Sequence, residues 1–188
     1  MGQTFRKTVE YLDQLGKLEG SIVEIGSSRK GDDQSTQFFY ELSKQLSVDF
    51  VTCDINEEII SGLHELDIPA VCQKGEDFLK SYNKPIGIVY LDNFDWNWRP
   101  MATEDWTWVQ INEYRDKYDM EMTNLTSAVT HLTQAIIVET KTTSNSLIVI
   151  DDTWFEHGRI RGRINTVHRW VIVCALYFHK SSAAIHIC

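Results

Sequence analysis

Short apolar runs alternate with amphipathic segments along most of the chain. The apolar runs have the length and the polar flanks of buried strands, and they lie at 21–25, 49–54, 69–73, 86–92 and 146–150. Segments with apolar residues three and four positions apart, the spacing of one helix face, lie at 35–47, 56–66, 75–82, 103–118 and 123–142. The pattern therefore predicts repeated β-α units.

Repeated β-α units predict the fold class. Parallel neighbouring strands need crossover connections, and right-handed crossovers place helices on both faces of the sheet. We expect an α/β fold, a doubly wound, Rossmann-like and mostly parallel sheet, closed by a C-terminal antiparallel strand pair at 169–178 and 183–188. Residues 1–188 have the size of a single domain, with a Trp-rich helical insertion at about 93–145.

Composition narrows the range of partners. Eighteen Lys and Arg against 27 Asp and Glu give a net charge of -9, which disfavours binding to a nucleic-acid backbone. No apolar run is long enough to cross a bilayer, and the polar N-terminus resembles neither a signal peptide nor a transit peptide. The four cysteines show no C-x-x-C spacing and fit reduced thiols. We expect a cytoplasmic protein with a small-molecule partner, no nucleic acid and no membrane; a homodimer stays open.

Polar residues follow the first strand, at the edge where a doubly wound sheet binds ligands. Glu24 and Gly26 end this strand, and Ser35 or Thr36 is a plausible cap for the next helix. A glycine lets the backbone approach a ligand closely, and free N–H groups at a helix start favour an anion. A glycine turn with a purely structural role explains the same residues about equally well. The loop matches neither the dinucleotide motif G-x-G-x-x-G nor the phosphate loop G-x-x-x-x-G-K-[ST].

The next two strand ends carry acidic residues. Asp54 ends the second strand, where nucleoside-binding folds bind the ribose hydroxyls; the alternative is that it caps the following helix. Glu76 and Asp77 follow the third strand and can face an adenine amino group. Their alternative is that acidic residues are simply favoured in the first turn of a helix.

More carboxylates follow the fourth and fifth strands, namely Asp92, Asp95, Asp151 and Asp152. If these strands are neighbours, their carboxylates converge on one edge of the sheet. An all-oxygen cluster of this kind is what Mg²⁺ prefers. The alternative is that each carboxylate caps a helix or faces water.

At these residues the sequence resembles the class I S-adenosylmethionine-dependent methyltransferases, and within them the metal-dependent O-methyltransferases of the catechol and macrocin type. The likeness covers roughly residues 20–155 and rests on five segments in order: VEIGSSRKGDDQST, VTCDIN, GEDFL, GIVYLD and LIVIDD. The resemblance implies methyl transfer from S-adenosylmethionine to a hydroxyl group of a small-molecule acceptor. It also implies assistance by Mg²⁺ or another divalent cation.

The resemblance assigns roles to individual residues. It places Gly26 against the methionine part of the cofactor, Glu24 in support of that loop and Asp54 on the ribose. The cofactor-binding residues that it implies are Glu24, Gly26, Ser27, Ser28, Asp54, Ile55, Glu76, Asp77 and Asp92. The metal ligands that it implies are Asp92, Asp151 and Asp152, and the catalytic residues are Asp92 and, as the base, Asp95.

Three features depart from the family pattern. The first loop carries the extra residues RKGDDQ, Asp95 stands where catechol-type enzymes carry a lysine base, and the segment 93–145 is longer than usual. These departures motivate an alternative, a Rossmann-like protein that binds a nucleoside cofactor without methyl transfer. A third hypothesis is a Rossmann-type enzyme that modifies sugars or nucleotides with another cofactor.

The insertion contributes aromatic residues whose role the sequence leaves open. Trp96, Trp98, Trp106 and Trp108 form a lid or acceptor pocket in a functional interpretation. Packing of the inserted helices onto the body explains at least half of them. His131 falls on the polar side of its helix and is predicted to lie at the surface.

Overall fold

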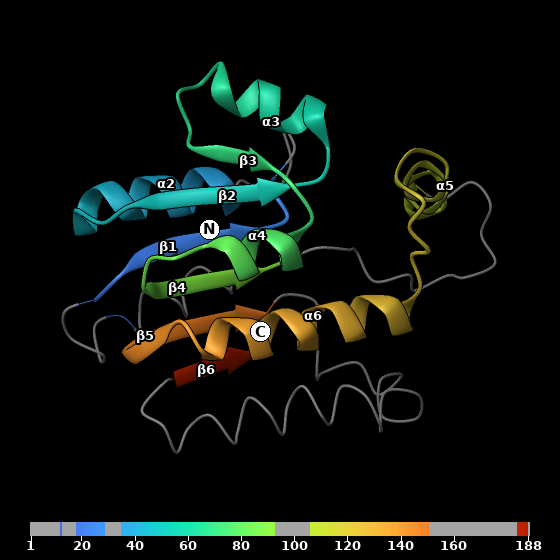
Figure 1. The fold of residues 1–188 in the computed structure, drawn as a ribbon. Coiled ribbons are helices and arrows are strands. Elements are labelled where there is room, and N and C mark those ends of the chain that lie inside the picture. The colour runs from blue at the N-terminus through green and yellow to red at the C-terminus, as the bar shows by residue number, and fades with distance from the viewer. Residues whose placement is uncertain (1–11, 13–17, 29–34, 93–105, 151–183, 188) are drawn as a thin grey trace.

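The computed structural model describes residues 12, 18–28, 35–92, 106–150 and 184–187, which form a layered α/β structure (Figure 1). The strands are β1 Ser21–Ile25, β2 Phe50–Asp54, β3 Ala70–Cys72, β4 Ile86–Leu91, β5 Thr142–Ile150 and β6 Ala184–Ile187. The helices are α2 Ser35–Leu46, α3 Glu57–His64, α4 Gly75–Ser81, α5 Trp106–Tyr118 and α6 Asn124–Glu139. None of these described helices has the length and apolarity needed to cross a membrane.

The described strands form one six-stranded sheet in the order β3-β2-β1-β4-β5-β6. Each neighbouring pair is parallel, and the strand order reverses between β1 and β4. Helices lie on both faces, with α2 behind the sheet and α4 and α6 in front of it in Figure 1. The predicted fold class is confirmed, since this is a doubly wound, Rossmann-like α/β sheet.

Each face of the sheet has its own apolar core, because successive residues of a strand point to opposite faces. Ile22 of β1 belongs to the same buried cluster as Phe39 of α2. Val23, the next residue, belongs to the cluster that contains Phe78 of α4. β1 and β4 are buried along their whole length, as expected for parallel strands covered on both sides. Polar chemistry is therefore confined mainly to the strand ends.

The C-terminal strand differs from the sequence-based expectation. The segment 183–188 was expected in an antiparallel pair with 169–178, but β6 pairs with β5 in parallel, with Leu147 opposite Ala184. A parallel neighbour requires a long crossover, and the segment 151–183 is long enough to supply one. The other expected strand, 169–178, lies outside the described residues.

The buried face of α6 is rotated from the predicted one. His131 was expected at the surface, but it is only 5% exposed, and Gln134 on the same face is fully buried. Val129 and Ile136 lie three and four positions from Leu132, a spacing that predicts a shared buried face, but they are about half exposed. Both polar side chains have interaction partners, and a partnered polar side chain can be buried at little cost.

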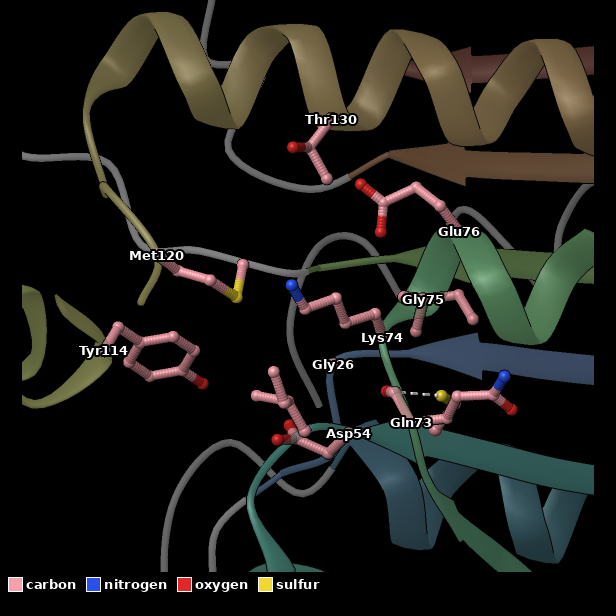
Figure 2. Close-up of a pocket in the computed structure, with 12 residues that line it drawn as sticks. Gly26, Asp54, Gln73, Lys74, Gly75, Glu76, Tyr114, Met120 and Thr130 are labelled. Atoms are coloured by element: carbon pink, nitrogen blue, oxygen red, sulfur yellow. Dashed lines mark hydrogen bonds between the residues drawn. The ribbon is translucent and has the colours of Figure 1, made fainter. Parts of the chain in front are cut away.

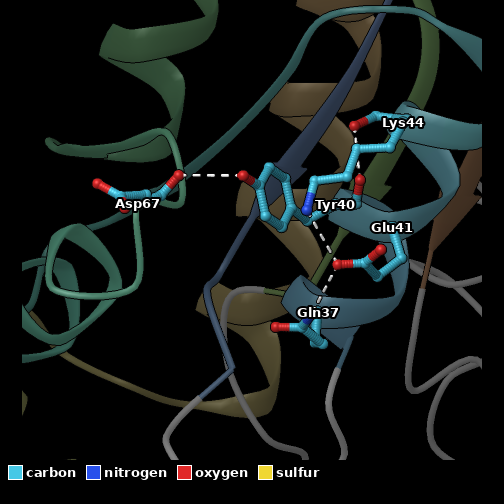
Figure 3. Close-up of polar contacts among 6 residues, drawn as sticks. Gln37, Tyr40, Glu41, Lys44 and Asp67 are labelled. Atoms are coloured by element: carbon cyan, nitrogen blue, oxygen red, sulfur yellow. Dashed lines mark hydrogen bonds and ion pairs between the residues drawn. The ribbon is translucent and has the colours of Figure 1, made fainter.

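The outer surface of α2 carries a small polar network (Figure 3). Glu41 accepts from Gln37 Nε2 at 3.0 Å and from Lys44 Nζ at 3.1 Å. Tyr40 Oη donates to the carbonyl of Asp67 at 3.1 Å, and Lys44 Nζ lies 3.8 Å from the Tyr40 ring centroid. Exposed ion pairs contribute little to stability. The hydrogen bond from Tyr40 to Asp67 joins α2 to the turn between α3 and β3.

The β3 edge of the sheet is short. β3 pairs only with Thr52, Cys53 and Asp54 of β2. The pairing ends at Pro69, whose carbonyl accepts from the Thr52 N–H at 3.0 Å but which has no N–H of its own to extend the ladder. The outer edge of β2 therefore continues past the end of β3.

Gly20 sets the entry into β1 and gives a testable prediction of stability. Its φ is +102°, and an added Cβ would lie 2.6 Å from the Pro85 carbonyl oxygen and 2.8 Å from the Gly87 nitrogen. Because both neighbours are backbone atoms, Gly20→Ala should lower the free energy of unfolding by about 3 kcal/mol, measured by urea titration.

The matched control for this substitution is Gly62→Ala. Gly62 lies within α3 and an added Cβ meets no atom within 4 Å. The higher helix propensity of alanine should therefore raise the free energy of unfolding by about 0.8 kcal/mol. Equal effects of the two substitutions would contradict the geometry at Gly20.

Candidate functional site

A cleft lies at the carboxyl edge of the sheet, beyond the ends of β1 and β2 (Figure 2). Its remaining walls come from the β3–α4 turn, from α5, from the connection between α5 and α6, and from α6. The cavity has a volume of about 40 Å³, which is room for one or two water molecules. This volume is smaller than a nucleoside needs, so a nucleoside bound here extends into the open side of the cleft or displaces lining side chains.

Gly26 forms the turn at the end of β1. Its φ is +89°, a left-handed conformation that side chains disfavour. Its N–H donates to the Cys53 carbonyl at 2.9 Å, which fixes the turn against β2. Gly26 lines the cleft, so a ligand can approach its backbone without meeting a side chain.

Asp54 ends β2 and lines the cleft at only 9% exposure. Its Oδ2 accepts from the Ser27 N–H at 3.0 Å and its Oδ1 from the Asn56 N–H at 2.8 Å. The cap of α3 is Asn56, whose side chain accepts from the N–H groups of Glu58 and Ile59, so the alternative role of Asp54 as that cap is wrong. The carboxylate instead joins the first loop to the end of β2.

Glu24 is wholly buried beneath the first loop. Its Oε1 accepts from Ser35 Oγ at 2.7 Å, whereas its Oε2 has no hydrogen-bond partner among the described residues. Burial raises the pKa of the Glu24 carboxyl group to about 7, and the hydroxyl groups of Ser35, Thr36 and Thr52 oppose the shift only in part. The carboxyl group therefore changes its charge near neutral pH.

A series of hydroxyl groups, the hydroxyl chain, connects Glu24 to the first loop. Ser35 Oγ uses its only proton on Glu24, so the 2.6 Å contact between Ser28 Oγ and Ser35 Oγ has Ser28 as donor. Ser28 Oγ accepts from the Thr36 N–H at 2.9 Å, and the Ser28 N–H donates to Thr36 Oγ1 at 2.8 Å. The chain thus ties Ser28 to the start of α2, with every hydroxyl proton directed toward Glu24.

The β3–α4 turn supplies both charges of the opposite wall. Lys74 precedes α4, Glu76 lies in its first turn, and both line the cleft, as Figure 2 shows. Asp77 is absent from the lining; it forms an ion pair with Lys80 at 3.4 Å on the exposed side of α4. The sequence placed Glu76 and Asp77 together, but the helical rotation between consecutive residues separates them.

Tyr114 of α5, Met120 of the following connection and Thr130 of α6 close the cleft on the side away from the strands. Tyr114 is 5% exposed and belongs to a small apolar cluster with Met122. The sequence analysis did not identify these three residues. Their segments carry no motif, and only the packing of α5 and α6 brings them to the strand ends.

Some of the predicted cofactor residues line the cleft, and others lie behind it. Gly26, Asp54, Ile55 and Glu76 line the cleft. Ser27 and Ser28 support the turn behind it, and Ser27 Oγ lies 2.6 Å from Thr52 Oγ1. Asp92 follows β4, where its N–H donates to the Ile25 carbonyl at 2.8 Å and its Oδ2 accepts from Tyr90 Oη at 3.3 Å.

The predicted metal site falls largely outside the described residues. Asp95, Asp151 and Asp152 lie there, and the residues that the structure describes contain no group of three His, Cys, Asp or Glu that could hold a metal ion. Leu91 and Ile150 are register partners, and they immediately precede Asp92 and Asp151 in the chain. The described part thus contributes a single carboxylate, which does not by itself form a magnesium site.

Comparison with known proteins agrees with the fold. No protein-family model matches the sequence, and no curated protein sequence matches it. The crystal structure of BdcA in complex with NADPH is similar to this chain with a TM-score of 0.55 and 8% sequence identity, over 89% of this chain and 68% of that chain. At this identity the likeness shows the fold alone. The chain is a Rossmann-like α/β protein with its cleft at the carboxyl edge of the sheet.

Proposed function

We propose that this protein binds a nucleoside-containing cofactor in the cleft, with Asp54 as the acceptor for the ribose hydroxyls. The observation that carries the proposal is the position of the Asp54 carboxylate, which lines the cleft beside the Gly26 turn. In Rossmann folds an acidic residue at the end of the second strand binds the ribose in this way.

Asp54 retains the capacity for this role. Its oxygens accept hydrogen bonds, and the Ser27 and Asn56 N–H groups donate one to each oxygen. The hydroxyl groups of a ribose are donors of the kind that this carboxylate accepts. The two backbone bonds also hold the carboxylate in place, which reduces the entropy lost on binding.

The charges of the cleft favour some nucleosides over others. BdcA was crystallised with NADPH, which carries a phosphate on its adenosine ribose, and a carboxylate at the ribose position repels such a phosphate. Among the residues that the structure describes, Asp54 and Glu76 line the cleft together with one cation, Lys74. We therefore expect a preference for an unphosphorylated ribose.

The start of α2 argues against a dinucleotide. Dinucleotide sites use free N–H groups at the helix start for the pyrophosphate. Here the Thr36 N–H donates to Ser28 Oγ at 2.9 Å, so this group is already occupied. A ligand whose nucleoside carries a neutral or cationic substituent fits the described residues better than a pyrophosphate does.

Isothermal titration tests the proposal directly. Adenosine, S-adenosylhomocysteine and S-adenosylmethionine should bind more tightly than NADP, by about tenfold, because the ribose phosphate faces Asp54. NAD separates the effect of the pyrophosphate from that of the ribose phosphate, because it carries the pyrophosphate but lacks the phosphate on the ribose. The proposal fails if none of the five compounds binds.

Methyl transfer from S-adenosylmethionine is the second candidate function. The charges of the described lining residues support it, because Asp54 and Glu76 favour the positive charge of a sulfonium ion. Asp54 would hold the ribose, and Gly26 would leave room for the methionine part. When bound, the sulfonium ion supplies the methyl group; the reaction also needs an acceptor, whose site the described residues do not define.

Magnesium binding stays a prediction that rests on Asp92 with Asp151 and Asp152. Titration of Mg²⁺ into the wild-type protein should show one binding event, and the same titration into the Asp92→Asn variant should show none.

Incubation with labelled S-adenosylmethionine and a panel of hydroxyl compounds distinguishes the two candidate functions. Methyl transfer to any acceptor supports the enzyme, and cofactor binding with no transfer leaves the binding protein.

The small volume of the cleft leads to a prediction about the rate of binding. Met120 and Tyr114 line the cleft on the side away from the strands, and we expect the Met120 side chain to lie in the path of an entering nucleoside. Met120→Ala should raise the association rate constant of adenosine several-fold, because a shorter side chain leaves the entrance open. Stopped-flow measurement checks this, and an association rate unchanged by the substitution would show that Met120 does not close the entrance.

A further inference from the structure

We propose that Glu24 is a positioning residue of the cleft, which holds the turn at residues 26–28 more firmly when its carboxyl group is ionised than when it is protonated. This inference rests on the proposed function of the cleft. Glu24 is wholly buried and therefore cannot touch a ligand. It acts through the hydroxyl chain of Ser35, Ser28 and Thr36.

The direction of the hydroxyl chain makes its strength depend on the charge of Glu24. Ser35 donates to Glu24 Oε1, and Ser28 donates to Ser35. A hydrogen bond to an ionised carboxylate is roughly twice as strong as one to a neutral group, and consecutive bonds polarise one another. Protonation of Glu24 therefore weakens the bond that holds Ser35 and, through it, the bond that holds Ser28.

The turn at residues 26–28, which these hydrogen bonds hold, forms part of the cleft. Ser28 is held by the start of α2, and the preceding Ser27 is held by Asp54 and Thr52. Gly26, which lines the cleft, immediately precedes these two serines. Weakening of the bond between Ser28 and Ser35 loosens the attachment of the turn to α2, which the two bonds between Ser28 and Thr36 then maintain alone, so more conformational entropy is lost when a ligand binds.

The groups around Glu24 place this change in charge near neutral pH. Burial of the carboxyl group opposes ionisation of Glu24, as does, to a smaller extent, the charge of Asp54 on β2. On the other side, the register partner of Glu24 is Tyr90 of β4, whose hydroxyl group donates to Asp92. α2 presents Ser35 and Thr36 and has no acidic residue in its first turn. Burial raises the pKa of Glu24 to about 7, so small changes in the anchoring of the loop shift its protonation.

Adenosine is the appropriate probe, because it does not titrate between pH 6 and pH 8. The wild-type protein should bind adenosine about five-fold more tightly at pH 8 than at pH 6. Binding at pH 7 should release up to about half a proton, since ordering of the loop favours the ionised carboxylate. Calorimetry in two buffers of different ionisation enthalpy measures this release without any substitution.

Two substitutions test whether Glu24 acts on the turn through Ser35 and Ser28. Glu24→Gln keeps an acceptor for Ser35 and removes the titrating group, so the affinity should become independent of pH. Ser35→Ala breaks the chain between Glu24 and Ser28 and should remove most of the pH dependence. Ser43→Ala is the matched control, because Ser43 is buried on the same helix but donates to the Tyr40 carbonyl; it should retain the five-fold change.

Each outcome has a defined meaning. A pH-dependent affinity in Glu24→Gln, or a full five-fold change in Ser35→Ala, overturns the inference while leaving the proposed function intact. So does a wild-type affinity that is constant with pH and coupled to no proton. If wild-type protein binds no nucleoside at any pH, the proposed function itself is wrong. If the Glu24→Gln variant does not fold, the pH dependence of adenosine binding to Ser35→Ala and the proton release of the wild type still test the inference.

Discussion

Asp54→Ala should weaken adenosine binding by about 100-fold and also destabilise the fold. Two hydrogen bonds from the ribose to a charged acceptor are lost, each worth roughly 1.5–3 kcal/mol. The Ser27 and Asn56 N–H groups lose their acceptor as well, which should lower the free energy of unfolding by about 2 kcal/mol. Calorimetric titration and urea unfolding measure the two effects separately.

Asp54→Asn distinguishes the two roles of this side chain. The amide keeps one acceptor oxygen and loses the charge, so both effects should be smaller than with alanine. Asp49→Asn is the control, since Asp49 forms an exposed ion pair with Lys84 at the opposite edge of the sheet and such pairs contribute little. If the Asp54→Ala variant stays folded and binds adenosine as tightly as the wild type does, Asp54 does not contact the ribose.

Glu24→Gln should stabilise the protein at alkaline pH and leave it nearly unchanged at pH 4. The folded-state pKa of Glu24 is about 7, above the ordinary 4.5. Between these values the folded protein binds more protons than the unfolded chain, so the free energy of unfolding decreases as pH rises. The full decrease is about 3 kcal/mol and is complete above pH 7.

The difference between the variant and the wild type isolates this contribution. Other carboxyl groups titrate in both proteins and cancel in the comparison. The stabilisation by Glu24→Gln should therefore grow from near zero at pH 4 to about 3 kcal/mol at pH 8, measured by urea unfolding at fixed ionic strength. Glu41→Gln, on the exposed face of α2, is the matched substitution and should give a small difference. A difference for Glu24→Gln that stays constant with pH would contradict the burial of an ionising group.

The strands could be predicted from the sequence because their burial is nearly uniform. The runs that became β1 and β4 are apolar apart from Ser21, Glu24 and Tyr90, and parallel strands covered on both faces leave such runs. The acidic end of β2 could be predicted for the same reason, since Asp54 is the residue at which the apolar run stops. The first motif also pointed to the turn at Gly26, whose positive φ the structure shows.

What the sequence could not predict depends on packing between distant segments. The buried face of α6 was misassigned because His131 and Gln134 have partners that make their burial affordable, and periodicity counts only apolar residues. Tyr114 and Met120 reach the cleft only through the path of α5. The hydroxyl chain joins positions that are seven or more residues apart, and serines in a polar loop give no signal of it.

The shortness of β3 also affects how the protein behaves at high concentration. A long exposed edge strand is a template on which a second chain can add its own strand, the usual route to fibrous aggregates. Here three residues form that edge and Pro69 interrupts it. Replacement of Pro69 by valine would restore a donor and lengthen the template, so sedimentation of concentrated samples should reveal self-association that the native chain avoids on this side.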